Sequence, residues 1–344
     1  MADNSLRPIA GEVEREERDL REKRDRRLTH DELERTEGCR HRNQGYSPQG
    51  GPHAYFLTFT VAGGAERTAL NKAIRDIHPS VQALAKKAKT ARLLCALGIG
   101  SELWDRLSPA TRPAGLRPFR AVTANGRVAP ATGGDLFLQI TSSRHDLNLD
   151  LAMELVRRLQ SLATVAEEIH GFRYLDSRDL TGFIDGIENP KGKARVAAAL
   201  IGEEDRSFAG GSYVAVQRYI HDLERWRKLD DHEQEQIIGR TKRGSVELSK
   251  AKKPQTAHIS RVVIERDGRE LQILRQSYPW GTVREAGLYF AAYTKFLDVF
   301  DVMLARMMGT TGDGLHDRLM EFSRAVTGAI FFVPSIETVS SLKQ

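Results

Sequence analysis

The order of expected strands and helices occurs twice along this 344-residue chain, and that repetition constrains the fold more than any other feature. Each block begins with a run in which large apolar residues alternate with smaller or polar ones, the pattern of a half-buried strand. Stretches with apolar residues at helical spacing follow in both blocks. Two successive blocks of this kind favour a duplicated α+β architecture with about 130 to 160 residues per block, an ordinary domain size.

The expected elements follow from these local patterns. In the first block we expect strands at 54–61, 92–99 and 135–141 and helices at 67–87 and 147–169. Pro79 predicts a break in the first of these helices, because proline lacks the N–H that an interior helical position needs. In the second block we expect strands at 211–220, 257–264, 270–278, 287–293 and 329–334 and helices at 222–238 and 298–308. Asp267-Gly268 predicts a hairpin turn between two of those strands.

The domain organisation follows from a change in composition near residue 45. Residues 1–45 are dominated by Glu, Asp and Arg and cannot bury a core alone. They are expected to form a flexible extension, a solvated helix or an arm that lies on a partner subunit. We therefore divide the chain into a charged extension at 1–45, a first domain at 46–178 and a second domain at 179–344.

Composition excludes several classes of protein. No stretch reaches the roughly 18 uncharged apolar residues that a membrane helix needs, and no apolar signal segment opens the chain, so we expect a cytoplasmic protein. The net charge is +6, but the basic residues are interleaved with nearly as many acids, which argues against nucleic-acid binding. Two cysteines, Cys39 and Cys95, are too few for a disulfide framework or a Cys-based metal site.

The segment Thr181-Gly-Phe-Ile-Asp-Gly-Ile-Glu-Asn-Pro190 connects the two blocks and contains the first candidate for chemistry. Glycines on both sides of Asp185 allow the backbone to turn sharply and to present an isolated carboxylate on a loop. A carboxylate held in this way suits proton transfer. The alternative is that Asp185-Gly186 is an ordinary turn.

A second group of candidates lies on the two strands expected around the Asp267-Gly268 turn. His258 is flanked by apolar residues, where a histidine is either a ligand or a satisfied core residue. Arg275 and Ser277 share one face of the following strand, because strand side chains alternate. A buried arginine needs an anionic partner, so an acid, an arginine and a histidine together would suit a cofactor with negative groups.

Four segments together resemble the dye-decolourising peroxidases, specifically the class B (P-type) branch: GFIDGIENP, AHISRVV, LQILRQSYPWG and DRLMEFSRAVTGAIFFVPS. The resemblance extends from about residue 45 to residue 335, with the segments in the family's order. It implies two ferredoxin-like domains with antiparallel sheets, as in the dimeric α+β barrel superfamily. It also implies a non-covalent haem b held mainly by the second domain, and the absence of a Cys-x-x-Cys-His motif agrees with this.

The resemblance assigns roles around that haem. His258 is expected to be the proximal ligand to iron, and Asp317 to be the acid that hydrogen-bonds this histidine. Asp185 and Arg275 are expected to be the distal pair that moves the proton of peroxide and stabilises the departing oxygen. Ser277 occupies a position where some relatives have Asn, and it is expected to hold distal water or peroxide.

The cofactor's negative edge also needs partners. Arg275 is expected to pair with a haem propionate, and Arg240 and Lys242 of the basic segment Gly239-Arg-Thr-Lys-Arg243 are further candidates. The alternative for each residue of that segment is an exposed basic turn. Bulky donors cannot reach a buried iron, so electrons are expected to pass through aromatic residues, for which the candidates are Tyr278, Trp280, Trp226 and Trp104. The alternative for each of these residues is simple packing in the core or at its rim.

The expected function is therefore a peroxidase in which hydrogen peroxide converts the haem to a ferryl state that dyes, phenols or other one-electron donors reduce. The alternatives are a haem storage or handover protein and an enzyme that removes iron from haem. Relatives often self-associate, so a homo-oligomer is expected. The last strand is followed closely by Ser340-Ser-Leu-Lys-Gln344, so loading into a protein nanocompartment through a C-terminal peptide is not expected.

Overall fold

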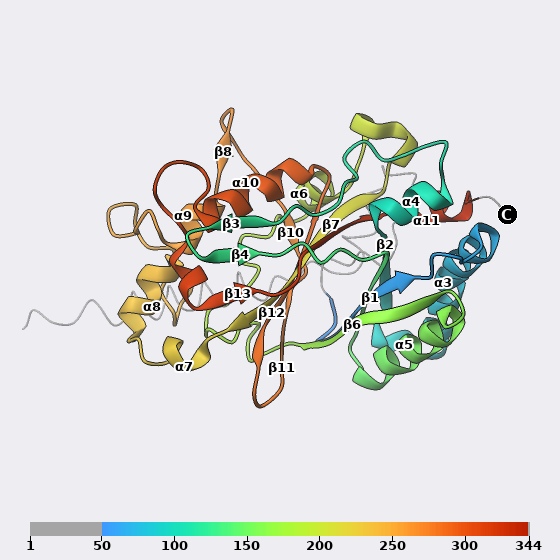
Figure 1. Ribbon diagram of the computed structural model, residues 1–344. Coiled ribbons are helices and arrows are strands. Elements are labelled where there is room, and N and C mark those ends of the chain that lie inside the picture. The colour runs from blue at the N-terminus through green and yellow to red at the C-terminus, as the bar shows by residue number, and fades with distance from the viewer. Residues whose placement is uncertain (1–49, 343–344) are drawn as a thin grey trace, which may run out of the picture. The chain divides into compact units, whose positions relative to one another are not determined.

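The computed structural model describes residues 50–342, so the predicted extension at 1–45 lies outside the described residues. Among the described residues, no helix has the length and apolar character needed to cross a bilayer. The elements of the first half, shown in Figure 1, are β1 (His53–Val61), α3 (Arg67–Lys87), η1 (Lys89–Ala91), β2 (Leu94–Ile99), α4 (Ser101–Leu107), β3 (Val122–Ala124), β4 (Arg127–Ala129), β5 (Leu136–Ser142), α5 (His145–Leu159) and β6 (Ala163–Phe172).

The second half repeats the main elements and adds short ones. They are α6 (Lys193–Ala199), η2 (Glu203–Phe208), β7 (Ser212–His221), α7 (Leu223–Trp226), α8 (Asp231–Ile238), α9 (His258–Val262), β8 (Glu265–Arg266), β9 (Arg269–Glu270), β10 (Leu274–Arg275), β11 (Tyr278–Gly281), β12 (Ala286–Thr294), α10 (Leu297–Met308), η3 (Arg318–Glu321), β13 (Ser323–Ala325), β14 (Ala329–Val333) and α11 (Ile336–Ser340).

Eight antiparallel strands close into a ring. The first half contributes four strands in the order β6-β1-β5-β2, and the second half contributes β11-β12-β7-β14. The halves meet where Trp280 of β11 pairs with Gly171 of β6 and where Phe332 of β14 pairs with Ile99 of β2. Followed once around the ring, the strands lie in the order β6-β1-β5-β2-β14-β7-β12-β11, so each half has its strands in the chain order fourth, first, third, second. This arrangement confirms the predicted mixture of helices with an antiparallel sheet.

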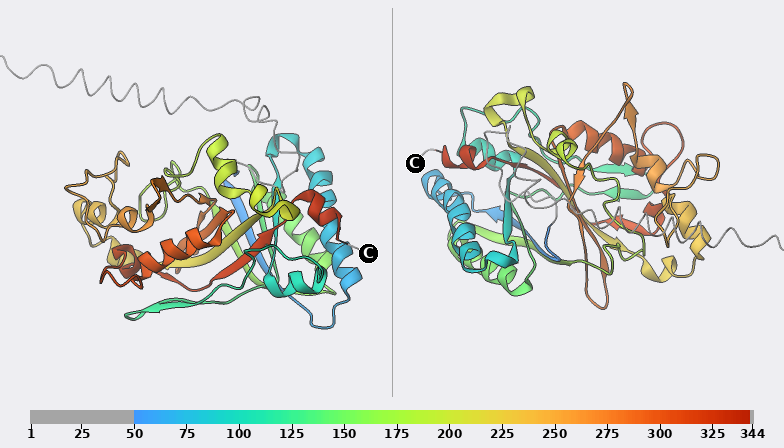
Figure 2. Two further views of the ribbon diagram at one scale, coloured as in Figure 1. Left: turned by 90° about the horizontal axis from the view of Figure 1, so that it is seen from above. Right: turned by 180° about the vertical axis from the view of Figure 1, so that it is seen from behind.

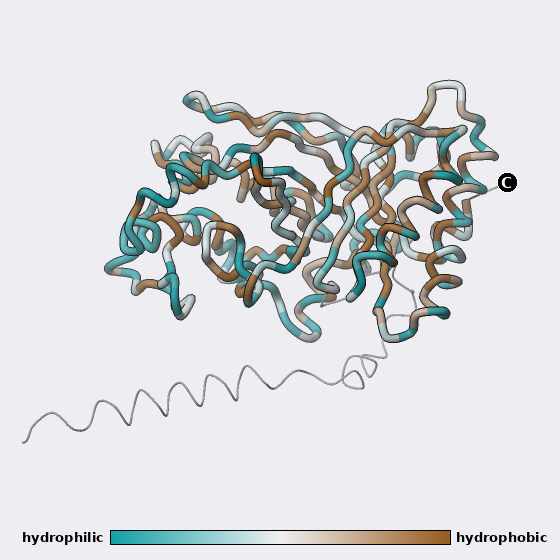
Figure 3. The backbone as a smooth tube through the Cα atoms, turned by 90° about the horizontal axis from the view of Figure 1, so that it is seen from below, coloured by the Kyte–Doolittle hydropathy of each residue, from teal (hydrophilic) through white to brown (hydrophobic). Residues whose placement is uncertain are grey.

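The interior of the ring is an aromatic core to which both halves contribute. Phe56 stacks on Tyr289 with ring centroids 4.1 Å apart, and Phe137 stacks on Phe331 at 5.2 Å. All four side chains are at most 1% exposed, and stacked aromatic pairs add to the stabilisation from burial. Figure 3 shows hydrophobic residues concentrated along the strands. The ring is therefore a packed core rather than a channel.

The outer faces of the two half-sheets are covered differently. Helices α3 and α5 pack on the first half-sheet, where Leu57 and Leu138 are fully buried (Figure 1). Over the second half-sheet, α9 and α10 contact each other and enclose a cavity. The β3–β4 hairpin of the first half runs alongside α10, as Figure 2 shows. The cavity therefore lies on the second half, and the hairpin of the first half packs beside α10, one of the helices that cover it.

Three expected helices differ from the structure. Helix α3 continues through Pro79, because the residues on both sides of it, Ile77 and Val81, are buried against the sheet and hold the helix there. The expected helix at 147–169 ends at Leu159, and 163–172 forms β6, because pairing with β1 outweighs local helix propensity. The expected helix at 222–238 is two helices, since Asp230 starts α8 with a capping box.

Two expected strands also differ. The prediction of a strand at 257–264 is wrong, because His258 begins the one-turn helix α9. The β-branched residues of this segment favour a strand, but the buried Arg261 guanidinium donates to the Arg306 carbonyl and to Asp313, and these bonds hold the turn. The predicted hairpin at Asp267-Gly268 is present as β8–β9. The strand expected at 270–278 is divided into β9, β10 and the start of β11.

Candidate functional site

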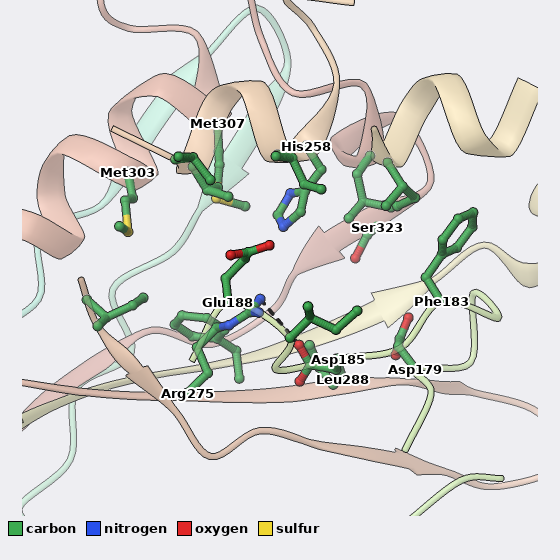
Figure 4. Close-up of a pocket in the computed structure, with 18 of the residues that line it drawn as sticks. Asp179, Phe183, Asp185, Glu188, His258, Arg275, Leu288, Met303, Met307 and Ser323 are labelled. Carbon is green, nitrogen blue, oxygen red and sulfur yellow. Dashed lines mark ion pairs between the residues drawn. The ribbon is translucent and has the colours of Figure 1, made fainter. Parts of the chain in front are cut away.

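A cavity of about 190 Å³ lies between the outer face of the second half-sheet and helices α8, α9, α10 and η3 (Figure 4). Most of its wall is apolar: Phe183, Ile184, Ile187, Ile238, Ile259, Val262, Val263, Leu271, Ile273, Leu288, Phe290, Phe300, Met303, Leu304, Met307, Leu319 and Met320. The polar lining includes Asp179, Thr181, Asp185, Glu188, Gln217, Tyr219, His221, Arg240, His258, Glu270, Gln272, Arg275 and Ser323. A cavity whose wall is mainly apolar and into which polar groups converge is typical of a cofactor site.

His258 stands at the helical side of this cavity. As the first residue of α9 it directs its imidazole into the cavity, as Figure 4 shows. Its Nδ1–H donates to Asp317 Oδ2 at 2.6 Å, and the Asp317 side chain is fully buried. Asp317 Oδ1 accepts the Leu319 N–H at 2.9 Å, which fixes the carboxylate. This bond leaves Nε2 of His258 as the nitrogen that offers a lone pair to a ligand.

Asp185 and Arg275 form an ion pair on the sheet side of the cavity. Arg275 Nη1 lies 3.2 Å from Asp185 Oδ1, and both side chains are about one-fifth exposed. The Gly186 N–H donates to Asp185 Oδ1 at 2.8 Å, and Gly186 adopts φ +81°, which favours glycine. In Figure 4 the Arg275 guanidinium and the His258 imidazole point into the cavity from opposite sides.

Asn189 joins the loop of Asp185 to the strand of Arg275, a role that the sequence analysis missed. Its side-chain amide accepts the Arg275 N–H at 2.9 Å and donates to the Arg275 carbonyl at 2.8 Å. A Cβ on Gly186 would approach Asn189 Nδ2 to 3.2 Å, so the glycine leaves room for this amide. The short spacing from Asp185 to Asn189 was the available signal, but the partner strand is 86 residues away.

The basic segment places its two candidates differently. Arg240 lines the cavity, pairs with Glu188, and donates to the Ser245 carbonyl at 2.6 Å. Burial lowers the pKa of Arg240; Glu247 opposes this shift and the charge of Arg275 adds to it. Lys242 does not line the cavity, and its ammonium lies 2.6 Å from Asp231. Arg240 can therefore contact a group bound in the cavity directly, whereas the Lys242 side chain lies outside the cavity wall.

A second buried His–Asp pair, also missed in the sequence, lines the same cavity. His221 Nε2 donates to Asp179 Oδ1 at 3.2 Å, and His221 Nδ1 lies 2.9 Å from Ser323 Oγ. Burial alone would raise the pKa of Asp179, but the charge of His221 and hydrogen bonds from His221 and Thr181 outweigh it and lower this pKa to about 2. The pair anchors the loop that carries Asp185 to the end of β7. No local sequence pattern marks His221.

The remaining candidates lie away from the cavity wall. Ser277 does not line it, and its Oγ accepts the Ala291 N–H at 3.2 Å. Of the aromatic candidates, Trp226 packs on the cavity residue Phe183 with ring centroids 6.3 Å apart. The other three are buried in the two larger cores: Trp104, Tyr278 and Trp280.

The donor set fits a haem. The apolar walls suit a flat macrocycle, the Nε2 of His258 suits an iron atom, and Arg240 and Arg275 supply cations for carboxylates at its edge. Both ring nitrogens of His221 are engaged within the protein. The described cavity therefore offers one free imidazole nitrogen, from His258, to a metal at its centre.

Comparison with known proteins identifies the family. The family models for Dyp-type peroxidase match at residues 44–173 (N-terminal) and 176–338 (C-terminal). A dye-decolorizing peroxidase of Mycolicibacterium paratuberculosis is 42% identical over 83% of this chain and 81% of its own length. The counterpart from Mycobacterium tuberculosis is 41% identical, over 83% of this chain and 86% of its own length. DyPB from Rhodococcus jostii superposes with a TM-score of 0.84 at 39% identity, covering 88% of this chain and 98% of that structure. The chain therefore belongs to the Dyp-type peroxidase family.

Proposed function

We propose that this protein is a haem-dependent peroxidase that uses hydrogen peroxide to oxidise dyes, phenols or other one-electron donors. One observation carries the proposal: an imidazole fixed by a buried carboxylate faces an arginine–aspartate pair across an apolar-walled cavity. Variants of the Rhodococcus jostii relative are described in complex with heme. The cofactor proposed here is haem b, held without covalent attachment.

His258 and Asp317 form the proximal side. Bound haem supplies an iron centre that exchanges electrons with peroxide and with donors. Nε2 of His258 would bind the iron of a haem held in this cavity, and the bond from Nδ1–H to Asp317 holds the imidazole in one tautomer and one orientation. A carboxylate on the outer nitrogen also makes the imidazole a stronger electron donor. The buried position of Asp317 keeps solvent from competing for this bond.

Asp185 and Arg275 form the distal side. Asp185 would accept a proton from one oxygen of hydrogen peroxide and donate it to the other, which can then leave as water, while a bound haem would supply the two electrons that cleavage of the O–O bond requires. The permanently charged guanidinium of Arg275 stabilises negative charge on the departing oxygen, and we propose that it contributes more than Asp185. Ser277 is proposed in a weaker role, as a hydroxyl that holds water or peroxide.

The cavity rim holds the cofactor's carboxylates. Arg240 and Arg275 are the proposed partners of the propionates, since both guanidinium groups line the cavity. Binding of a propionate at Arg240 would compete with Glu188, its present partner. Lys242 is a proposed contributor from outside the wall, through its charge. The proximal and distal pairs therefore act on iron and peroxide, and the arginines orient the cofactor.

The fold supports two ferredoxin-like domains divided near residue 178, in the class B branch of the family. The identical strand order of the halves supports this division, as do the limits of the family models at 173 and 176. A cytoplasmic homo-oligomer is proposed. A Mycobacterium smegmatis relative is described as encapsulated, so co-expression with an encapsulating shell would test the location.

The test is stopped-flow absorption of the haem-loaded protein mixed with one equivalent of hydrogen peroxide. Arg275→Ala should slow the spectral change by about 10²- to 10³-fold, the cost of removing one donor to a developing anion. His258→Ala should alter the spectrum before mixing. Arg218→Ala is a matched control, because Arg218 forms a similarly exposed pair with Glu167 away from the cavity wall.

Two outcomes would support the alternatives instead. A feeble reaction of the intact haem-loaded protein, with rapid haem exchange, would indicate a storage or handover protein. Release of iron with free porphyrin would indicate an enzyme that removes iron from haem. Equal rates for the wild type and Arg275→Ala would contradict the distal role of the arginine.

A further inference from the structure

The strand that carries Arg275 is interrupted directly after that residue. β10 ends at Arg275 and β11 begins at Tyr278, yet both pair with β12 in one continuous register. In an uninterrupted antiparallel pair, Gln276 and Ala291 would exchange two backbone hydrogen bonds. The Gln276 N–H does donate to the Ala291 carbonyl at 2.8 Å, but the Ala291 N–H donates to Ser277 Oγ at 3.2 Å. The peptide between Gln276 and Ser277 is therefore turned out of the ladder.

The turned carbonyl is held by a residue of the other half of the chain. Gln139 of β5 donates from Nε2 to the Gln276 carbonyl at 3.1 Å. Its Oε1 accepts the hydroxyl of Tyr293 at 2.7 Å. Gln139 and Tyr293 are each 3% exposed, and Gln139 is paired in the ladder with Phe56 and Ala96 of the aromatic core. The amide thus lies inside the ring of strands, on the opposite face from the cavity.

A polar side chain in this core requires a reason. Burying an amide costs free energy unless its groups are hydrogen-bonded, and an apolar residue would fill the same space without that cost. Both polar atoms of the Gln139 amide are engaged, one by a side chain and one by the peptide next to Arg275. The second bond exists only while that peptide is turned. The geometry thus couples Gln139 to the conformation of the segment that presents the distal side chains.

We propose that Gln139 is a positioning residue for the distal side of the haem site. It holds the Gln276 carbonyl inside the ring and so fixes where Arg275 presents its guanidinium. Because the Gln276 carbonyl is turned toward Gln139, the Ala291 N–H donates to Ser277 Oγ instead. The hydroxyl hydrogen of Ser277 can then donate to another group. The inference rests on the proposed function, because it concerns the placement of a side chain toward the iron-bound ligand.

Fluoride binding to the ferric, haem-loaded protein tests the proposal, since an anion on the iron accepts hydrogen bonds from distal donors. Gln139→Leu should weaken fluoride binding by about tenfold, the loss expected for one hydrogen bond to an anion. It should also shift the charge-transfer absorption band of the fluoride complex toward that of Arg275→Ala. Tyr293→Phe is the matched control, because it removes the other hydrogen bond of Gln139 and retains the one to Gln276.

Gln139→Glu provides a test by rescue. The carboxyl group that this substitution introduces can donate to the Gln276 carbonyl when it is protonated and cannot when it is ionised. Fluoride affinity corrected for the wild-type pH profile should therefore fall as this carboxyl ionises. Equal fluoride affinity and band position in Gln139→Leu and Tyr293→Phe would overturn the proposal. Failure of the proposed function is separate: the wild type itself would then react feebly with peroxide, while the comparison of fluoride affinities would still be informative.

Discussion

The two halves of the ring have the same strand order and differ in what faces outward from their first strands. On β1 the outward side chains are Tyr55, Leu57 and Phe59, which are buried beneath helices. On β7 the cavity-facing side chains include Gln217, Tyr219 and His221. The first half therefore has a sealed apolar interface between sheet and helices, and the second half has a cavity with polar groups on its floor.

This difference shows how one architecture can serve stability and chemistry separately. Apolar burial stabilises a sheet–helix interface without constraining a bound group. Polar groups on the equivalent face need partners or a ligand. In the second half, Asp179 and Ser323 satisfy His221, whereas Gln217 Nε2 has no hydrogen-bond partner among residues 50–342. The apolar interface of the first half thus stabilises the ring, and the second half has polar side chains that a ligand can contact.

The largest expected effect is loss of stability from the sealed face. Phe59→Ala should lower the free energy of unfolding by about 3–5 kcal/mol, because a fully buried aromatic side chain is removed and leaves a cavity. Urea denaturation of the apo-protein measures this. The absorption spectrum and peroxide rate per bound haem should be unchanged. A slower peroxide reaction in the folded variant would show that packing in the first half also affects the chemistry of the second half.

A second prediction compares Asn189, which is half-buried, with Asn148, which is fully buried. Asn189→Ala should cost about 1–3 kcal/mol, because the Arg275 N–H and carbonyl lose their partners, and it should also slow the reaction with peroxide. Asn148→Ala in α5 is the control, since neither polar atom of its amide has a hydrogen-bond partner among the described residues. We expect Asn148→Ala to be neutral or stabilising. Equal peroxide rates in the two variants would show that the Asn189 amide does not position Arg275.

The sequence was sufficient to predict the local features of this comparison. Alternation of apolar residues predicted β1, β5, β7 and β14 to within about two residues, because each strand has a buried face. Asp185, Arg275 and His258 could be named as candidates from an acid between glycines, an arginine on an expected strand and a histidine among apolar residues, but their expected roles came from the resemblance to the dye-decolourising peroxidases. The cavity contains all three, and their roles remain proposals.

Features that depend on pairing between distant segments could not be predicted. Closure of the ring rests on single pairs such as Trp280 with Gly171, and local composition does not encode register. His258 was expected on a strand because its neighbours are β-branched, but bonds from Arg261 to a distant loop stabilise a helical turn. Gln139 and Asn189 act through partners 137 and 86 residues away.

The buried carboxylate of Asp179 should make the free energy of unfolding fall at low pH. The pKa of Asp179 is about 2 in the folded protein, below its ordinary value of 3.8. A lowered folded-state pKa contributes stability above the unfolded value, and this contribution is lost as the pH falls toward 2. Between about pH 5 and about pH 2, the wild type should lose on the order of 2 kcal/mol more than Asp179→Asn. Urea midpoints at several pH values measure the difference, and parallel curves would show that Asp179 is not the responsible group.

The smallest effect should separate the two basic candidates at the edge of the cavity. Arg240→Met removes a guanidinium that lines the cavity, whereas Lys242→Met removes an ammonium paired with Asp231 outside it. An exposed ion pair contributes about 0.2–1 kcal/mol, so Lys242→Met should change stability little. Haem affinity, measured by transfer to apomyoglobin, should fall more for Arg240→Met, because a desolvated cation next to a carboxylate is stabilising. Equal losses of haem affinity in the two variants would mean that the positive charge acts on the propionates at long range. Direct contact between Arg240 and a propionate would then contribute little to binding.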